Sequence, residues 1–369
     1  MGVVPATARA QLLDDIGALG QDIQHGVCPS RVAKAESTWT VWCKFCASIN
    51  VSPSLTEVDD PLFVILLFGK QYREGKITKN PVRARTAEDA MRQVGQAFSL
   101  LGLIDPRMDR SGTKLDIRLT RLVSCWKKMD GGSTRRRPLP LGLLRYATVM
   151  ANRADATNAT KAMHRLLMLG VFFLLRPGEY LSKATAQAPF KLKQLFFRIG
   201  EREYRGDTIP LALLRDRVDS LTFAGLQFDL QKNGVPDEKI GLGSAKKPVG
   251  TDPVKILAAI ALELRLHPET TGDTPIYTYY DSYGVSRKIS DRMMTTFLRA
   301  LSLVVPTDQH PTIGALRCTG ATILLEGGIP ADLIKLLGRW QSDEVFRYLH
   351  TQSELLMQEL TDALIDRVN

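Results

Sequence analysis

Five side chains in the second half of the chain are of types that together bind and cleave a phosphodiester. Arg176 lies in the run LLRPGEYL, Lys232 lies in QKNG, and Arg317 lies near the start of an expected helix. Trp340 and Tyr348 follow in LLGRWQSDEVFRYLH. A guanidinium grips two phosphate oxygens with a fixed fork of donors, an indole N–H only donates, and a phenol can serve as nucleophile. This order of residue types suggests a site that holds a phosphodiester and attacks it.

Taken singly, each of these residues also has an ordinary structural interpretation. Arg176 and Glu179 could form a helix-end ion pair, which contributes little to stability. The Glu179 carboxylate could equally orient the Arg176 guanidinium. Lys232 could be a solvated hairpin lysine, Trp340 a core anchor, and a single helical tyrosine is usually structural. Helix N-termini attract phosphate, which favours the chemical interpretation for Arg317.

Helical periodicity dominates the first 130 residues and predicts a compact helical domain. We expect its helices over residues 31–49, 61–74, 85–102 and 114–128. The first of them places Trp39, Trp42, Phe45 and Cys46 on one face. A loose segment, residues 1–25, precedes this domain, which spans residues 26–130. Gly, Pro and three Arg make residues 131–140 a predicted linker.

Residues 141–369 are predicted to form a second domain in which helices accompany a small sheet. The expected helices cover residues 140–153, 158–175, 253–265, 287–303, 314–326, 330–337 and 343–350, and an amphipathic stretch follows them. Residues 188–249 contain three segments typical of strands, with the turn signal Asn233-Gly234 between the second and third. The predicted fold class is therefore mainly α with a small antiparallel β-sheet (α+β).

Basic residues concentrate around the predicted linker. The net charge of +10 favours a polyanionic partner, nucleic acid first. Residues 110–145 hold ten Lys and Arg against two acids, which indicates either a solvated surface or phosphate contact. The residues that we expect to contact DNA are Lys114, Arg118, Arg121, Lys127, Lys128, Arg135, Arg136 and Arg137.

Other features argue against a membrane protein and against a metalloprotein. The longest apolar run, from Leu166 to Leu175, is far shorter than the roughly twenty residues that a bilayer span needs. Cys43 and Cys46 have no second Cys or His pair nearby, so buried small hydrophobic residues are favoured over a zinc or redox site. The first residues lack the pattern of a signal peptide. We expect an intracellular protein without a cofactor.

The motifs taken together resemble the tyrosine recombinase (phage integrase) family. The matches are LLRPGEYL, QKNG, LRCTGAT and LLGRWQSDEVFRYLH, and the last of these is similar to the version found in eukaryotic mobile elements. The resemblance covers residues 30–352. It implies a two-domain clamp around double-stranded DNA, with residues 26–130 as the core-binding (SAM-like) domain and residues 141–369 as the catalytic domain.

The resemblance also implies a role for each candidate residue. Arg176 and Arg317 would hold the non-bridging oxygens of the scissile phosphate, and Lys232 would protonate the 5′-oxygen leaving group. Trp340 would donate to a phosphate oxygen, and Tyr348 would attack to form a 3′-phosphotyrosine. No metal or nucleotide is needed, because arginines neutralise the charge that develops at phosphorus. Glu179 would support the site structurally.

The resemblance further implies self-association on DNA. The C-terminal stretch would dock on a neighbouring protomer or, alternatively, pack on its own domain. In a eukaryotic host the protein would be nuclear.

One position departs from the family pattern. The family usually has His three residues before the second Arg, where this chain has Gly314. Loss of one acid/base group typically lowers a rate by ~10²–10⁴-fold. His310 is an alternative source of an imidazole. The sequence therefore predicts a site-specific DNA recombinase impaired at Gly314. The alternatives are a DNA-binding protein derived from a mobile element that has weakened or lost catalysis, and a helical interaction protein.

Overall fold

The protein is described by a computed structural model covering residues 29–109, 111–131, 137–182, 189–229, 237–246, 251–307 and 310–341, together with residues 18, 26 and 365. The chain divides into two compact units, residues 1–134 and 135–369. The division falls inside the segment 131–140, where the run of Gly, Arg and Pro lies.

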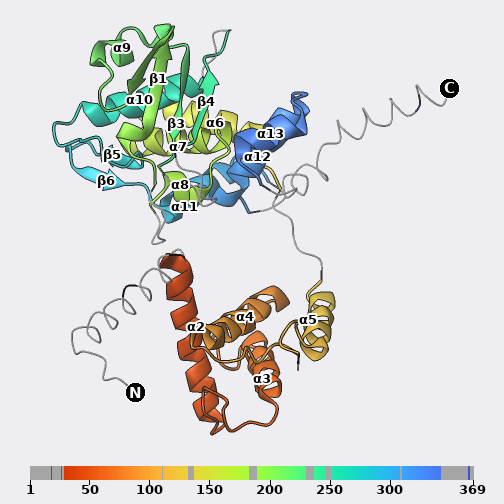
Figure 1. Cartoon of the computed structure of the whole chain (residues 1–369). Helices are drawn as coiled ribbons and strands as arrows, with labels where there is room; N and C mark the ends of the chain where they lie inside the picture. The colour runs from red at the N-terminus through yellow and green to blue at the C-terminus, as the bar shows by residue number, and fades with distance from the viewer. Residues whose placement is uncertain are drawn as a thin grey trace, which may run out of the picture. The chain divides into compact units, whose positions relative to one another are not determined.

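The named elements in the described part of the first unit are all helices, and an isolated bridge joins Met108 to Leu115 (Figure 1). Its helices are α2 (Pro29–Ser48), α3 (Pro61–Arg73), α4 (Ala84–Leu100) and α5 (Ile117–Met129). They match the four expected helices, with ends shifted by three residues at most. Pro61 occupies the first turn of α3, and the Asp116 side chain caps α5 by accepting the backbone N–H of Arg118. The core is aromatic, with Trp42 edge-on to Phe68 at 5.2 Å between ring centroids.

The second unit combines helices with two small sheets. Its helices are α6 (Leu141–Asn152), α7 (Asn158–Phe172), α8 (Pro177–Tyr180), α9 (Leu211–Arg215), α10 (Pro253–Arg265), α11 (Asp291–Ser302), α12 (Leu316–Glu326) and α13 (Ala331–Gly338), with 3-10 turns at Leu192–Gln194, Val218–Ser220 and Ile313–Ala315. Helix α7 is central, because it packs against α6, α10 and α12. A Cβ on Gly320 of α12 would overlap the Val171 carbonyl oxygen, so glycine allows α12 to lie directly on α7.

The larger sheet is antiparallel, with strands in the order β2-β1-β3-β4. The strands are β1 (Leu195–Ile199), β2 (Arg202–Arg205), β3 (Phe223–Gln227) and β4 (Lys239–Gly243), and a separate pair is formed by β5 (Thr278–Tyr280) and β6 (Ser286–Lys288). Gly225 pairs with Gly241 across β3 and β4. A Cβ on Gly225 would lie 2.6 Å from the Phe196 ring, so the ring packs directly on the glycine backbone. This contact favours the observed register, because a one-residue shift would place a side chain under the ring.

The chain enters the second unit beside α12. The Leu139 backbone N–H donates to Thr319 Oγ1 at 2.8 Å, and both groups are buried. The Thr319 hydroxyl in turn donates to the Ala315 carbonyl at 2.8 Å. The residues that lead into α6 are therefore anchored on α12.

The fold class predicted from the sequence, mainly α with a small antiparallel sheet, is confirmed. Strands β2, β5 and β6 and helices α8 and α9 were not predicted. Helix α7 ends at Phe172 rather than at residue 175, because Leu174 adopts a left-handed conformation with φ of 48°. Of the segment expected as a first strand, only residues 195–199 join the larger sheet; Lys191 makes an isolated bridge with Pro275, and a 3-10 turn follows it. The helix expected over 343–350, the stretch after it and most of residues 1–25 lie outside the described residues.

No helix in the described ranges combines the length and the apolar character that a membrane crossing requires. Within the same ranges, no three His, Cys, Asp or Glu side chains gather closely enough to hold a metal ion. Cys46 is buried in the first unit, and burial, with a smaller effect of Cys43, raises its pKa to about 12. This thiol therefore behaves as a small core residue.

Candidate active site

Arg176 lies at the N-cap of the short helix α8, not at the end of α7 as expected. Glu179, three residues later, accepts the Arg176 backbone N–H at Oε2 (2.8 Å) and the Arg176 Nη1 at Oε1 (3.2 Å). The Glu179 side chain is only 4% exposed, whereas that of Arg176 is 30% exposed. The carboxylate therefore holds the guanidinium from the protein side while part of it stays accessible to an anion.

Arg317 is the second residue of α12 and is largely buried. Its Nη2 donates to the Gly338 carbonyl, and its Cζ lies 4.2 Å from the centroid of the Trp340 ring. A guanidinium stacked on an indole is held by the negative face of the ring. Arg317 is thus fixed between the first turn of α12 and the residues that end α13.

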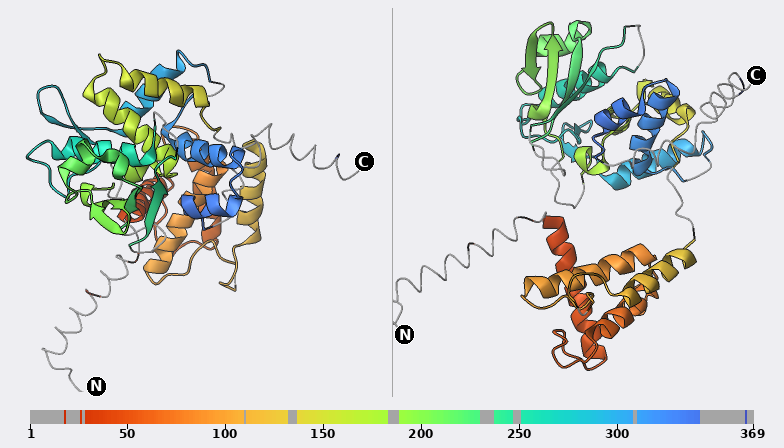
Figure 2. Two further views of the ribbon diagram at one scale, coloured as in Figure 1. Left: turned by 90° about the horizontal axis from the view of Figure 1, so that it is seen from above. Right: turned by 45° about the vertical axis from the view of Figure 1, so that its right-hand side comes forward.

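Trp340 follows α13 and packs against Leu174, Ala321 and Ile334. Figure 2 shows α12 and α13 side by side in both views, and the two helices are in contact. The indole therefore serves as a core anchor and also carries the Arg317 guanidinium on its face.

Gly338 is the last residue of α13, but it does not adopt the left-handed conformation that often ends a helix. Arg339, not Gly338, takes the left-handed conformation, with φ of 56°. Gly338 is required for space, because a Cβ there would overlap the Trp340 ring. The glycine lets the indole fold back over the end of its own helix.

Arg339 is a site residue that the sequence analysis missed. Its side chain is 2% exposed, and its Nη2 donates to Glu179 Oε2 at 3.0 Å. Its Cζ lies 4.2 Å from the centroid of the Phe228 ring. Burial lowers its pKa, and the nearby Glu179 carboxylate opposes that shift. No signal in the sequence pointed to it, because Gly338 is the residue type usual at a left-handed helix end, whereas the structure has this conformation at Arg339.

Three consecutive residues, 338–340, connect Arg176 and Arg317. Gly338 accepts from Arg317, and Trp340 lies under the same guanidinium. Between them, Arg339 bonds to Glu179, which holds Arg176. The structure thus brings four sequence-predicted residues, Arg176, Glu179, Arg317 and Trp340, into one connected arrangement.

The remaining two predicted residues, Lys232 and Tyr348, lie outside the described residues. Lys232 is in the segment between β3 and β4, whose described ends meet where the Phe228 backbone N–H donates to the Glu238 carbonyl at 2.9 Å. Tyr348 follows Trp340 by eight residues.

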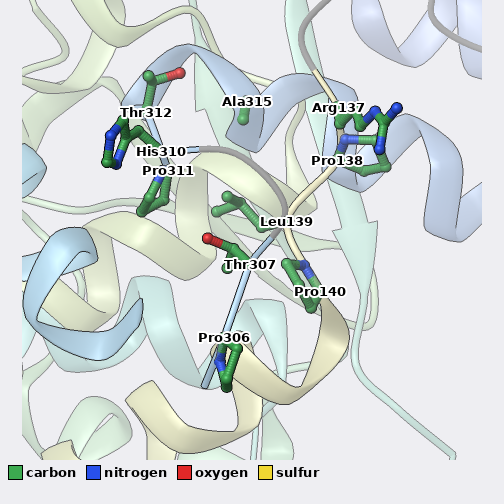
Figure 3. Close-up of a pocket in the computed structure, with 10 residues that line it drawn as sticks. All are labelled: Arg137, Pro138, Leu139, Pro140, Pro306, Thr307, His310, Pro311, Thr312 and Ala315. Atoms are coloured by element: carbon green, nitrogen blue, oxygen red, sulfur yellow. The ribbon is translucent and has the colours of Figure 1, made fainter. Parts of the chain in front are cut away.

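Gly314 lies in the 3-10 turn Ile313–Ala315, directly before α12. His310, the alternative imidazole, lines a cavity of about 190 Å³ together with Arg137, Leu139 and Thr307 (Figure 3). Arg317 is not among the residues that line this cavity. The His310 imidazole therefore belongs to a cavity at the entrance of the second unit.

Helix α5 has one apolar face and one basic face. Leu119, Val123 and Trp126 are buried, with the spacing expected for one helix face. Arg121 and Lys128 lie seven residues apart on the exposed side. Such a stripe can contact successive phosphates of a duplex.

Some of the expected DNA-contacting residues already have acidic partners. Arg118 pairs with Asp60 at 2.6 Å and with Asp116 at 3.2 Å, and Lys127 pairs with Glu88 at 2.8 Å. In the described part of the chain, no ion pair involves Lys114, Arg121 or Lys128. Arg135 and Arg136 lie outside the described residues, and Arg137 lines the cavity of Figure 3.

Solved structures that are similar to this chain include tyrosine recombinases and integrases. The XerA recombinase is 13% identical, with 89% of this chain and 98% of that chain covered and a TM-score of 0.38. The lambda integrase, solved as a dimer bound to a core site, is 14% identical, with 90% and 93% covered and a TM-score of 0.48. The Tn1549 transposon integrase, solved with transposon right end DNA, is 10% identical, with 83% and 84% covered and a TM-score of 0.44.

No family model and no curated protein matches the chain. Because these identities and TM-scores are low, the similarities assign no activity to this protein.

Proposed function

We propose that this protein is a site-specific DNA recombinase that cleaves and rejoins duplex DNA through a 3′-phosphotyrosine. The observation that supports this most directly is the three-residue segment 338–340, which joins Arg317 to the Arg176–Glu179 pair. Two guanidinium groups held in fixed positions suit the two non-bridging oxygens of one phosphate. The order of the motifs in the sequence assigns the role of nucleophile to Tyr348.

In the proposed reaction the Tyr348 hydroxyl loses its proton to water, its oxygen bonds to phosphorus, and the bond to the 5′-oxygen breaks. Lys232 gives a proton to the leaving oxygen, and Arg176 and Arg317 neutralise the charge on the other two oxygens. A 5′-hydroxyl attacking the phosphotyrosine reverses the step and releases the tyrosine. No side chain at Gly314 can accept or donate a proton during either step, so we expect slow chemistry.

The proposed partner is double-stranded DNA, bound by both units. Residues 26–130 would act as the core-binding domain and residues 141–369 as the catalytic domain, joined by residues 131–140. The exposed basic face of α5, with Arg121 and Lys128, suits phosphate contact in the first unit. We also propose self-association on DNA through the C-terminal stretch and, in a eukaryotic host, a nuclear location.

The test begins with sequencing of the fragments that the full chain retains from a DNA library. A duplex of the retained sequence with a nick beside the cleavage position then traps the intermediate, because the short strand diffuses away. We expect a covalent protein–DNA adduct that is absent in Tyr348→Phe. Tyr283→Phe is the matched control, since Tyr283 is 89% exposed and lies on the turn between β5 and β6. An adduct that survives Tyr348→Phe refutes the proposal.

One observation favours a second candidate, a DNA-binding protein without turnover. Gly314 has no side chain, and His310 lines the cavity of Figure 3, to which Arg317 does not contribute. Salt-sensitive DNA binding by the folded protein without any adduct would support this candidate.

A further inference from the structure

Arg339 shares a single buried carboxylate with Arg176. Glu179 Oε2 accepts the Arg339 Nη2 at 3.0 Å and the Arg176 backbone N–H at 2.8 Å. That leaves Oε1 for the Arg176 side chain, which reaches it with Nη1 alone at 3.2 Å. Arg176 therefore makes a one-nitrogen contact instead of the two-nitrogen fork that arginine usually forms with a carboxylate.

Because Glu179 shares its two oxygens between Arg339 and Arg176, several N–H donors of Arg176 stay available. A guanidinium has five N–H donors in a rigid plane, and a two-nitrogen contact with Glu179 would turn much of that plane towards the protein. With Oε2 occupied by Arg339, the Arg176 side chain stays 30% exposed. Its remaining N–H groups are then free to meet an anion.

The position of Arg339 is otherwise unfavourable for an arginine. Its backbone has φ of 56°, a conformation that suits glycine, and its guanidinium is nearly inaccessible to water. Among the described residues, its Nε and Nη1 have no hydrogen-bond partner. Glu179 and the face of Phe228 are the groups that hold it. Because glycine would suit this backbone better, we infer that the Arg339 guanidinium itself has a role, which is its bond to Glu179.

Arg339 also lies where the parts of the site meet. Its two chain neighbours hold Arg317, and its own side chain reaches α8 through Glu179. Phe228, under its guanidinium, stands at the end of β3, where the segment with Lys232 begins. A displacement of Arg339 would therefore shift the contacts of α12, of α8 and of the residues that follow β3.

We propose that Arg339 is a positioning residue: by occupying Oε2 of Glu179 it sets the Arg176 guanidinium to face a phosphate. This inference rests on the proposed recombinase function for the identity of the anion. Arg339 itself does not touch DNA, because its side chain is buried.

The kinetic test compares Arg339→Gly and Arg339→Lys with the wild-type chain. Glycine suits the left-handed backbone, so this variant removes the guanidinium with little strain at the helix end. Lysine retains a charge and a donor for Glu179. We expect single-turnover adduct formation to fall ~10²-fold in the glycine variant and ~10-fold in the lysine variant, with duplex affinity within about threefold of wild type.

The control is Arg165→Lys, which alters the ion pair between Arg165 on α7 and Glu263 on α10 in the same unit. We expect its adduct rate, per folded molecule, to match wild type. In a Glu179→Gln background the further loss on Arg339→Gly should be small, because both changes remove the same contact. Fully multiplicative losses, or equal losses in the Arg165 control, would overturn the positioning role.

A second readout does not depend on catalysis and separates failure of this inference from failure of the proposed function. In a crystal structure of the Arg339→Gly chain we expect Arg176 to make two contacts with Glu179 and to become less exposed. An unchanged one-nitrogen contact would refute the proposal, whether or not the wild-type protein forms an adduct. Absence of any wild-type adduct, with the expected rearrangement of Arg176, would refute only the recombinase function.

Discussion

Replacement of Gly338 by alanine tests whether the end of α13 depends on space. A Cβ on Gly338 would overlap Cζ3 and Cε3 of Trp340 and lie 2.6 Å from Cη2, whereas ordinary contacts begin near 3.4 Å. Overpacking of this kind costs about 1–3 kcal/mol. Displacing the indole also removes its contact with Arg317, worth about 0.5–2 kcal/mol. Alanine gains about 1 kcal/mol over glycine in a helix, so we expect net destabilisation of about 0.5–4 kcal/mol.

Two measurements on the Gly338→Ala protein check this prediction. Urea unfolding gives the change in the free energy of unfolding. The four indole N–H signals of the chain report ring positions, and the signal lost in Trp340→Phe identifies Trp340. We expect that signal to shift in Gly338→Ala and to stay in place in Gly178→Ala, where a Cβ meets nothing within 4 Å. Wild-type stability with an unmoved Trp340 signal would show that the overlap is relieved at no cost and that this reasoning is wrong.

Three further predictions follow from buried or missing polar groups. Burial lowers the pKa of His164 to about 4. The contribution of the neutral imidazole to the free energy of unfolding is therefore complete above about pH 6.5 and is lost as the pH falls to about 4, a loss of about 3 kcal/mol. Urea unfolding across this pH range should show the loss in wild type but not in His164→Gln. Thr319→Val leaves the buried Leu139 N–H without its acceptor, so we expect a loss of about 1–3 kcal/mol in urea unfolding relative to Thr319→Ser; equal stabilities would contradict this. Gly314→His should raise the yield of adduct on nicked DNA about tenfold or more, and an unchanged yield in the folded variant would show that Gly314 does not limit the reaction.

The long helices were predictable because their apolar residues recur with helical spacing and their ends carry recognisable signals. Pro61 begins α3, the Asp252 side chain caps α10, and Gly327-Gly328 follows α12. Short elements gave no such signal. Strand β2 has the sequence REYR and lies at the edge of the sheet with little buried surface, so it has no apolar alternation to detect.

The candidate site was predictable as a set of residue types but not as a set of contacts. Arg176 and Glu179 are close in sequence, so their pairing could be anticipated from the spacing alone. The bond from Arg339 to Glu179 spans 160 residues and forms only when α13 ends beside α8. Nothing in the local pattern distinguishes a buried arginine from a solvated one, because burial depends on partners that the fold brings together.

The hydrogen bond between Leu139 and Thr319 has a consequence for how movement can spread through the molecule. It fixes the incoming chain to the same helix that presents Arg317, at a point two residues past that arginine. The Leu139 backbone and the Arg317 guanidinium are therefore held by residues two positions apart in one helix. A displacement of the Leu139 backbone would therefore act on the helix turn that carries Arg317.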